Sequence, residues 1–335
     1  MASHTVNIRG GQPLFDLVSF GRRGPGRTDG LSLAQVEQIA RTVRRVPEVM
    51  LKVSGGGTTP KAVIAHLKYI DRHGELDIET DDGEKLKREG VEKSLIEDWD
   101  LDADAAVSQS PYAGKPGRKP IKLVHNVILS MPAGTPPDRL LAASHAFARE
   151  QFAFKHRYAI VLHTDQAHPH THLVIKAMGE QGERLNIRKA SLREWRREFA
   201  RHLREHGVAA NATERAVRGA TTPQKLDGVY RPMHDPKRYS THMQERVESV
   251  SADLLTGDIR VEPGKAKLLK TRKEVERGWQ AVSDVLMSEG QPKLAAQVKG
   301  FIEQMPLPRT EREWLRDEVR GHVERPLARE QLLTR

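Results

Sequence analysis

The clearest folding signal of the chain lies in residues 157–178, RYAIVLHTDQAHPHTHLVIKAM, where two apolar runs flank a histidine-rich segment. Short runs rich in Val, Ile and Leu are typical of β-strands, and the polar residues between them indicate a turn. His163 ends the first run, whereas His170 and His172 stand at the start of the second. Because side chains alternate along a strand, His170 and His172 are predicted to share one face, and an antiparallel return brings His163 beside them. The segment therefore predicts a β-hairpin with converging imidazoles.

This histidine cluster predicts a divalent-metal site. The chain contains no cysteine, so a metal must be held by His, Asp or Glu. Three imidazoles would leave coordination positions open for a ligand such as a phosphate oxygen. The alternative is that these are surface or core histidines that only happen to cluster. In the turn, Asp165 would orient a ligand or accept a proton and His168 would contact substrate, unless both are ordinary turn residues.

The surrounding sequence predicts an α+β domain over residues 46–215. Strand-like runs alternate with helical segments, so we expect a largely antiparallel sheet covered by helices on one face. One helix is predicted to begin at the pair Thr59-Pro60, a capping residue followed by proline, and to stop at Gly74. Strands are expected in EVMLKVS (48–54), ELDIET (75–80), KLVHNVILSM (122–131), RYAIVLH (157–163), THLVIKAM (171–178) and ERLNI (183–187). Further helices are expected in residues 135–154 and from Ser191, where Glu194 completes a capping-box pattern, to Gly207.

Composition and charge give the predictions for the two ends of the chain and for its binding partner. Residues 1–45 are predicted to form an N-terminal arm with a helix and the segment GRRGPGR (21–27), and residues 216–335 a helical, charged C-terminal region. Fifty-five Lys and Arg against 45 Asp and Glu give a net charge of +10, which favours a polyanionic partner such as nucleic acid. No stretch approaches the roughly 18 consecutive apolar residues of a membrane span, and MASHTVNIRGGQ does not resemble a secretory signal. We therefore expect a cytoplasmic protein without membrane insertion.

Tyr69 stands out on the helix that follows the glycine turn GGGTTP (55–60). Val63, Leu67 and Ile70 share one face of that helix, and Tyr69 lies about 120° from the centre of this face. Its hydroxyl can therefore face a cleft, although spacing alone favours simple packing at a helix flank. The remaining tyrosines lie in less defined settings: Tyr112, Tyr158, Tyr230 and Tyr239.

Together, the tyrosine helix and the histidine segment resemble the MOBP relaxases of conjugative and mobilisable plasmids, and especially the T-DNA border endonucleases. The resemblance covers residues 48–220 and is carried in order by GGGTTPKAVIAHLKYIDRHGELDIE (55–79), HNVILSMPAGT (125–135), HTDQAHPHTHLVI (163–175) and NATERAVRG (211–219). One departure is Ala167, which stands where relatives carry an acid. An acidic contribution at that point is therefore absent or has moved to Asp165.

The resemblance implies an HUH-type relaxase palm, with Tyr69 as nucleophile and His163, His170 and His172 as ligands of Mg or Mn. It also implies a single-stranded DNA substrate at a transfer origin, accessory mobilisation proteins, a type IV secretion coupling protein, and carriage of the protein with DNA into a recipient cell. Ligand softness would favour Zn or Mn for three imidazoles, because Mg prefers oxygen ligands, so the metal stays open among the three.

The resulting hypothesis is metal-dependent nicking and strand transfer at a plasmid or mobile-element origin through a 5′-phosphotyrosyl DNA intermediate. A phenol with a pKa of about 10 needs a base, which stays undecided between Asp165, His168 and another group. His125, on a predicted strand, would touch the ligands or DNA if it is not an ordinary strand histidine. Arg215 and Arg218 would follow the phosphate backbone if they do not simply face solvent.

Three other functions share part of this pattern. A rolling-circle replication initiator or a transposase would use the same chemistry in another DNA context. A noncatalytic DNA-binding mobilisation accessory would keep the fold without cleavage. A metallohydrolase would use the histidines to activate water and would not need Tyr69.

Overall fold

A computed structural model of the protein describes Leu17 and residues 30–87, 90–109, 121–220, 241–257 and 262–320. These residues form two units, one comprising residues 44–212 and the other comprising Leu17 and residues 30–43 and 213–320. The segment GRRGPGR and three tyrosines, Tyr112, Tyr230 and Tyr239, lie outside the described residues.

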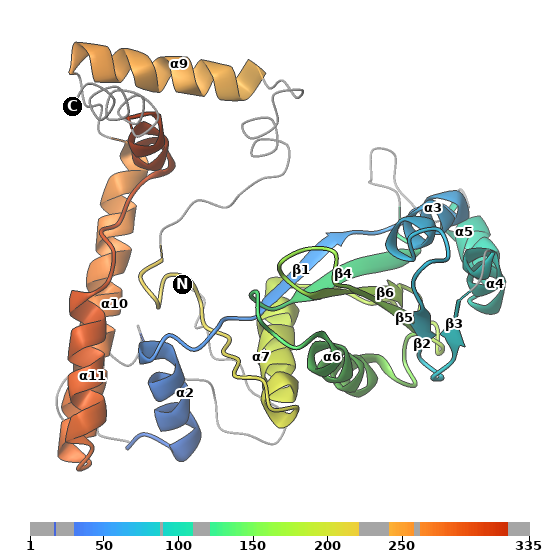
Figure 1. Ribbon diagram of the computed structural model, residues 1–335, viewed down its shortest axis with the longest axis horizontal. Helices are drawn as coiled ribbons and strands as arrows, with labels where there is room; N and C mark the ends of the chain where they lie inside the picture. The colour runs from blue at the N-terminus through green and yellow to red at the C-terminus, as the bar shows by residue number, and fades with distance from the viewer. Residues whose placement is uncertain are drawn as a thin grey trace, which may run out of the picture. The chain divides into compact units, whose positions relative to one another are not determined.

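The 44–212 unit is built on a six-stranded antiparallel sheet with the strand order β1-β4-β6-β5-β2-β3 (Figure 1). Its strands are β1 (Met50–Gly55), β2 (Ile78–Thr80), β3 (Lys85–Leu86), β4 (Val124–Ser130), β5 (Tyr158–His163) and β6 (His170–Lys176). The predicted hairpin is confirmed, because β5 and β6 pair antiparallel with His163 opposite His170. The prediction of an α+β domain with an antiparallel sheet is confirmed as well.

Helices cover both faces of this sheet, so the expectation of helices on one face was wrong. On one face pack α6 (Pro137–Phe152) and α7 (Lys189–Glu205), with Phe147 and Phe199 fully buried in that core. On the other face pack α3 (Pro60–Ile70), α4 (Val91–Asp98) and α5 (Leu101–Gln109). The second layer is needed because the strands are apolar on this face too, at Val124, Ala159, Val161 and Val174. Helices α4 and α5 were not predicted.

Local sequence signals predict the start of α3 correctly, but they do not predict the start of α7 or the structure of ERLNI. Thr59 caps α3 as predicted, its hydroxyl accepting a hydrogen bond from the backbone N–H of Ala62 at 3.2 Å, with Pro60 at the first helical position. The N-cap of α7 is Arg188, three residues before the predicted N-cap Ser191; Ser191 instead occupies the third helical position, where its hydroxyl accepts from the N–H of Arg188. The segment ERLNI is not a strand, since Arg184 forms only an isolated bridge with Met178.

The second unit is helical in its described part. It contains α2 (Leu33–Val43), α9 (Thr241–Thr256), α10 (Pro263–Ser288), α11 (Pro292–Glu303) and a further helical stretch at residues 311–320. Helices α2, α10 and α11 share a core that contains Trp279 and Phe301, so the helix predicted within the N-terminal arm packs with the C-terminal region. Val250 of α9 packs against Leu315.

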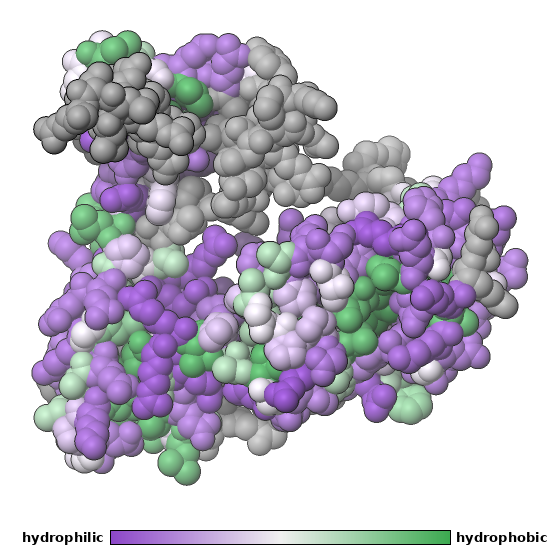
Figure 2. Space-filling model, viewed as in Figure 1, coloured by the Kyte–Doolittle hydropathy of each residue, from purple (hydrophilic) through white to green (hydrophobic). Residues whose placement is uncertain are grey.

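Polar residues are prominent on the face of the molecule seen in the space-filling view (Figure 2). In the space-filling view, hydrophilic residues make up most of the visible face of each unit (Figure 2). Among the described helices, none combines the length and the apolar character that a membrane crossing requires.

Candidate metal centre

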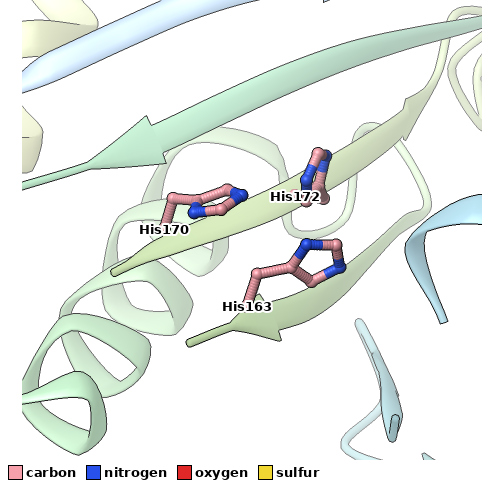
Figure 3. A group of neighbouring side chains, drawn as sticks. All are labelled: His163, His170 and His172. Carbon is pink, nitrogen blue, oxygen red and sulfur yellow. The ribbon is translucent and has the colours of Figure 1, made fainter. Parts of the chain in front are cut away.

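Three histidines converge at the end of the β5–β6 hairpin. In the strand register His163 lies opposite His170, and His172 lies opposite Val161. The ring centroids of His163 and His172 are 4.4 Å apart, and each of the two lies 5.1 Å from that of His170 (Figure 3). One nitrogen of each ring lies within 4.8 Å of the corresponding atoms of the other two. The structure thus brings together all three histidines that the sequence predicted as ligands.

The hydrogen bonds of His163 and His170 indicate which nitrogen of each ring carries the lone pair. Nε2 of His163 donates to the carbonyl of Ile70 at 2.5 Å, so the lone pair of this ring lies on Nδ1. Nδ1 of His170 donates to the carbonyl of His168 at 3.1 Å, which leaves its lone pair on Nε2. Nδ1 of His172 is buried and has no hydrogen-bond partner among the described residues.

The protonation states also suit a cation. Burial lowers the pKa of His163, and the neighbouring charge of Arg72 lowers it further. Burial, followed by the charges of His163 and His170, lowers the pKa of His172 to about 3. Imidazoles must be neutral to act as ligands, so these rings are ready to bind at neutral pH. The triad therefore fits a divalent metal ion.

Tyr69 is presented on α3 beside this triad. The helix is anchored by Val63, Leu67 and Ile70, each with no exposed surface, whereas Tyr69 is 58% exposed. Its ring stacks on that of His66 with a centroid separation of 6.4 Å. His66 in turn meets His172 edge to face, at 6.3 Å. A chain of ring contacts therefore runs from Tyr69 to the triad.

Arg72 joins the tyrosine, the triad and Asp165. Its guanidinium carbon lies 5.2 Å from the centroid of the Tyr69 ring, and Nη2 lies 3.3 Å from Nδ1 of His163. The same Nη2 forms an ion pair with Asp165 at 2.5 Å. The hydrogen bond from Arg72 lowers the pKa of Asp165, so this carboxyl is ionised and is a weaker base than a free aspartate.

His168 and His125 are not brought to the triad. His168 lies in the exposed turn, where its Nδ1 accepts a hydrogen bond from the N–H of Ala133 at 3.0 Å. His125 lies on β4, one residue from Val124, which packs on the α3 side of the sheet, and its neighbours Val53 and Leu192 pack on the α7 side. Because side chains alternate along a strand, His125 faces away from the triad. Its position gives no support to a contact with the metal ligands.

Arg215 and Arg218 belong to the helical unit. The turn that carries them is held by α10, whose Trp279 donates to the carbonyl of Val217 at 2.8 Å and whose Arg272 donates to that of Gly219 at 2.7 Å. Arg215 is exposed and Arg218 is half-buried. The structure assigns neither arginine to the 44–212 unit, which contains the triad.

Sequence reasoning missed two residues of the site, His66 and Arg72. His66 precedes Tyr69 by three positions, a spacing that places two side chains side by side on a helix, and this signal could have identified it. Arg72 carries no comparable signal, because its direction depends on how the chain reverses after α3.

Comparisons with known proteins relate part of this chain to DNA relaxases. Residues 74–208 match the family model of a relaxase nuclease domain described as MobA/VirD2-like. The matched stretch contains His163, His170 and His172, and it begins five residues after Tyr69. The T-DNA border endonuclease VirD2 of Agrobacterium fabrum is 27% identical over 191 residues, covering 53% of this chain and 42% of that protein. VirD2 of Rhizobium radiobacter is 28% identical over 192 residues, covering 52% and 43%. The chain thus spans less than half the length of these relatives.

A solved structure is also similar. It is described as "Molecular Basis of Vancomycin Resistance Transfer in Staphylococcus aureus", and it is 15% identical, with a TM-score of 0.32, covering 50% of this chain and 99% of its own.

Proposed function

We propose that this protein nicks one strand of DNA at a transfer origin with Tyr69 as the nucleophile, because its residues 74–208, which include the triad, match a relaxase nuclease domain and the chain is similar to VirD2. The observation that carries this proposal is the linkage of Tyr69 to the triad through Arg72, which lies 5.2 Å from the tyrosine ring and 3.3 Å from a ligand nitrogen of His163. An exposed tyrosine held beside a metal site can reach a phosphodiester that binds there.

In the proposed reaction the hydroxyl oxygen of Tyr69 attacks the scissile phosphorus. A bond forms between that oxygen and phosphorus, the bond from phosphorus to the 3′-oxygen breaks, and the 3′-oxygen leaves with a proton. The products are a 5′-phosphotyrosyl DNA and a free 3′-hydroxyl, so the energy of the phosphodiester is kept for later rejoining. This retention distinguishes strand transfer from hydrolysis.

The side chains of the site have separate proposed roles. His163, His170 and His172 would hold a divalent ion, which would supply Lewis-acid stabilisation of the negative charge on the phosphate oxygens. Nitrogen ligands suit Mn or Zn, and the family resemblance favours Mg or Mn, so Mn satisfies both arguments. Asp165 is the proposed acceptor of the tyrosine proton: its 2.5 Å ion pair with Arg72 weakens it as a base but links it to the residue that contacts the Tyr69 ring.

The wider setting follows from the same resemblance. We propose single-stranded DNA at a transfer origin as the substrate, with accessory mobilisation proteins and a type IV secretion coupling protein as partners. The net charge of +10 supports a polyanionic substrate.

A covalent-adduct assay tests this function. Wild type and Tyr69→Phe are incubated with labelled single-stranded oligonucleotides that span transfer origins, with Mn²⁺, Mg²⁺ or chelator, and SDS-stable protein–DNA bands are measured. We expect a metal-dependent band that falls by at least about 10³-fold in Tyr69→Phe, because phenylalanine has no nucleophilic oxygen. Tyr158→Phe is the matched control, since Tyr158 is a buried residue of β5 and should leave the band in place.

Two results would contradict the proposal. Metal-dependent cleavage without an adduct, and unchanged in Tyr69→Phe, would indicate a metallohydrolase. Binding without cleavage on every origin substrate would indicate a DNA-binding accessory.

A further inference from the structure

We propose that Arg72 is a positioning residue that limits how tightly the histidine triad binds a divalent cation and couples that binding to Tyr69. This inference rests on the metal site of the proposed function and concerns its regulation. In the arrangement observed, the guanidinium group of Arg72 contacts a metal-ligand nitrogen, the neighbouring carboxylate and the tyrosine ring.

His163 has a single nitrogen lone pair through which it could bind a cation. Because Nε2 of this ring donates to the carbonyl of Ile70, only Nδ1 can bind a cation. Nη2 of Arg72 lies 3.3 Å from that same Nδ1. A guanidinium has only donors, so it must donate to Nδ1 and occupies the lone pair that a cation would need.

The positive charge of Arg72 also opposes cation binding at the triad. A guanidinium remains positive at any pH that the protein meets, and it repels a divalent cation placed at the triad. Asp165 would attract such a cation, since its carboxylate lies 4.0 Å from Nδ1 of His163. The 2.5 Å ion pair with Arg72 neutralises that carboxylate. Occupation of the lone pair, repulsion and neutralisation all act in the same direction, against binding.

A left-handed turn of the backbone after α3 places Arg72. After α3 the chain turns through three consecutive residues with positive φ, Arg72 at 55°, His73 at 60° and Gly74 at 90°. Two of these are not glycine, and the left-handed conformation costs such residues of order 1 kcal/mol or more. The turn is closed by hydrogen bonds from the N–H of Asp71 to the carbonyl of Leu67, and from that of His73 to the carbonyl of Lys68. The backbone thus directs Arg72 back toward the triad at an energetic cost.

Arg72 links cation binding at the triad to the proposed nucleophile, Tyr69. The guanidinium of Arg72 also lies over the ring of Tyr69 and donates to its backbone carbonyl at 3.3 Å. A cation that takes over Nδ1 of His163 must displace Arg72 from it, and so changes the contacts of Arg72 with Tyr69 and Asp165. Metal binding and the surroundings of the nucleophile are therefore coupled.

Direct titration with Mn²⁺, by calorimetry and by the electron paramagnetic resonance of free Mn²⁺, tests this inference on the full chain without DNA. We expect Arg72→Gln to bind Mn²⁺ about tenfold more tightly than wild type, because the variant loses the charge and frees both Nδ1 and Asp165. Asp165→Asn should bind more weakly than wild type, because Arg72 then keeps its charge without a partner. Lys61→Gln is the charge-matched control, since Lys61 is an exposed lysine at the start of α3, the helix that Arg72 follows, and it should bind like wild type.

His172→Ala separates the inference from the function on which it rests. Binding that disappears in this variant belongs to the triad. If Arg72→Gln binds no more tightly than Lys61→Gln, or binds more weakly than wild type, the inference is overturned while the metal site stands. If no variant shows binding that depends on His172, the metal site itself is refuted and the inference with it. Should Arg72→Gln fail to fold by circular dichroism, the opposite shift expected for Asp165→Asn decides the question.

Discussion

His125 lies in a hollow of about 550 Å³ whose lining includes the apolar residue Leu192 and the cations Lys122 and Arg184. Burial, followed by the charge of Lys122, lowers the pKa of His125 to about 4. A histidine in the unfolded chain has a pKa of about 6.5, so the unfolded state takes up this proton first as the pH falls. The contribution of His125 to stability is therefore complete above about pH 6.5 and is lost as the pH falls towards 4.

We expect His125→Leu to reduce the loss of stability between pH 7.5 and 5. Leucine suits the apolar walls of the hollow and takes up no proton, and after allowance for solvent screening the gain at pH 5 relative to wild type should be about 1 kcal/mol. Urea unfolding at both pH values measures it. An equal loss of stability in wild type and variant would show that His125 does not contribute to the pH dependence.

At this scale the sequence predicted that three histidines converge, but not what surrounds them. His163, His170 and His172 follow from strand alternation and one hairpin, both of which are local rules. Arg72 could not be predicted, because its contacts depend on a left-handed turn after α3 and on a strand about 90 residues further along the chain. The placement of His125 away from the triad depends on the register of β4, which the residue pattern alone did not fix.

The glycine turn before α3 shows how an element is held in place. A Cβ atom on Gly56 would lie 2.2 Å from the carbonyl oxygen of Val124, so the backbones of the turn and of β4 approach too closely for a side chain. At Gly55, one residue earlier, a Cβ atom would meet nothing within 4 Å. The turn therefore requires glycine at one position and only tolerates it at the other.

We expect Gly56→Ala to lower the free energy of unfolding by more than about 2 kcal/mol, because backbone atoms must move to make room. Gly55→Ala should be neutral or slightly stabilising, since alanine is less costly than glycine in a strand. Thermal unfolding of the two variants side by side measures the difference. Equal melting temperatures would mean that the close approach to β4 does not hold α3 in place.

Helices and strands were predicted correctly where their sequence signals come from neighbouring residues. The cap at Thr59, the apolar stripe of α7 and the β5–β6 hairpin follow from short-range patterns. Helices α4 and α5 were not predicted from the sequence, and neither was the helical layer that they form on the second face of the sheet. An apolar strand residue indicates burial, but it does not say which partner buries it, and only the tertiary fold decides that.

On the scale of the whole molecule, the two units have separate cores. In the helical unit, Trp279 is 2% exposed and its Nε1 donates to the carbonyl of Val217, so one side chain contributes to the core and also holds the turn at Val217. The triad and Tyr69 draw on residues of the other unit alone. Damage to one core should therefore leave the other intact.

We expect Trp279→Ala to destabilise the helical unit by about 3–5 kcal/mol, through the cavity that it leaves in a buried core. Mn²⁺ binding by the triad should remain within about twofold of wild type. Calorimetric unfolding and Mn²⁺ titration of the same preparation test both statements. Loss of Mn²⁺ binding together with the first transition would show that the units depend on each other.

The hydrogen bond from His163 to the carbonyl of Ile70 ties the last turn of the tyrosine helix to the ligand strand. Helix ends normally fray, and fraying here would break the bond that fixes which nitrogen of His163 carries its proton. Local opening at the end of α3 should therefore also disturb the arrangement of the three histidines. A bound cation would slow amide exchange at the end of α3, and any substitution that loosens this turn would weaken the cation's hold in equal measure.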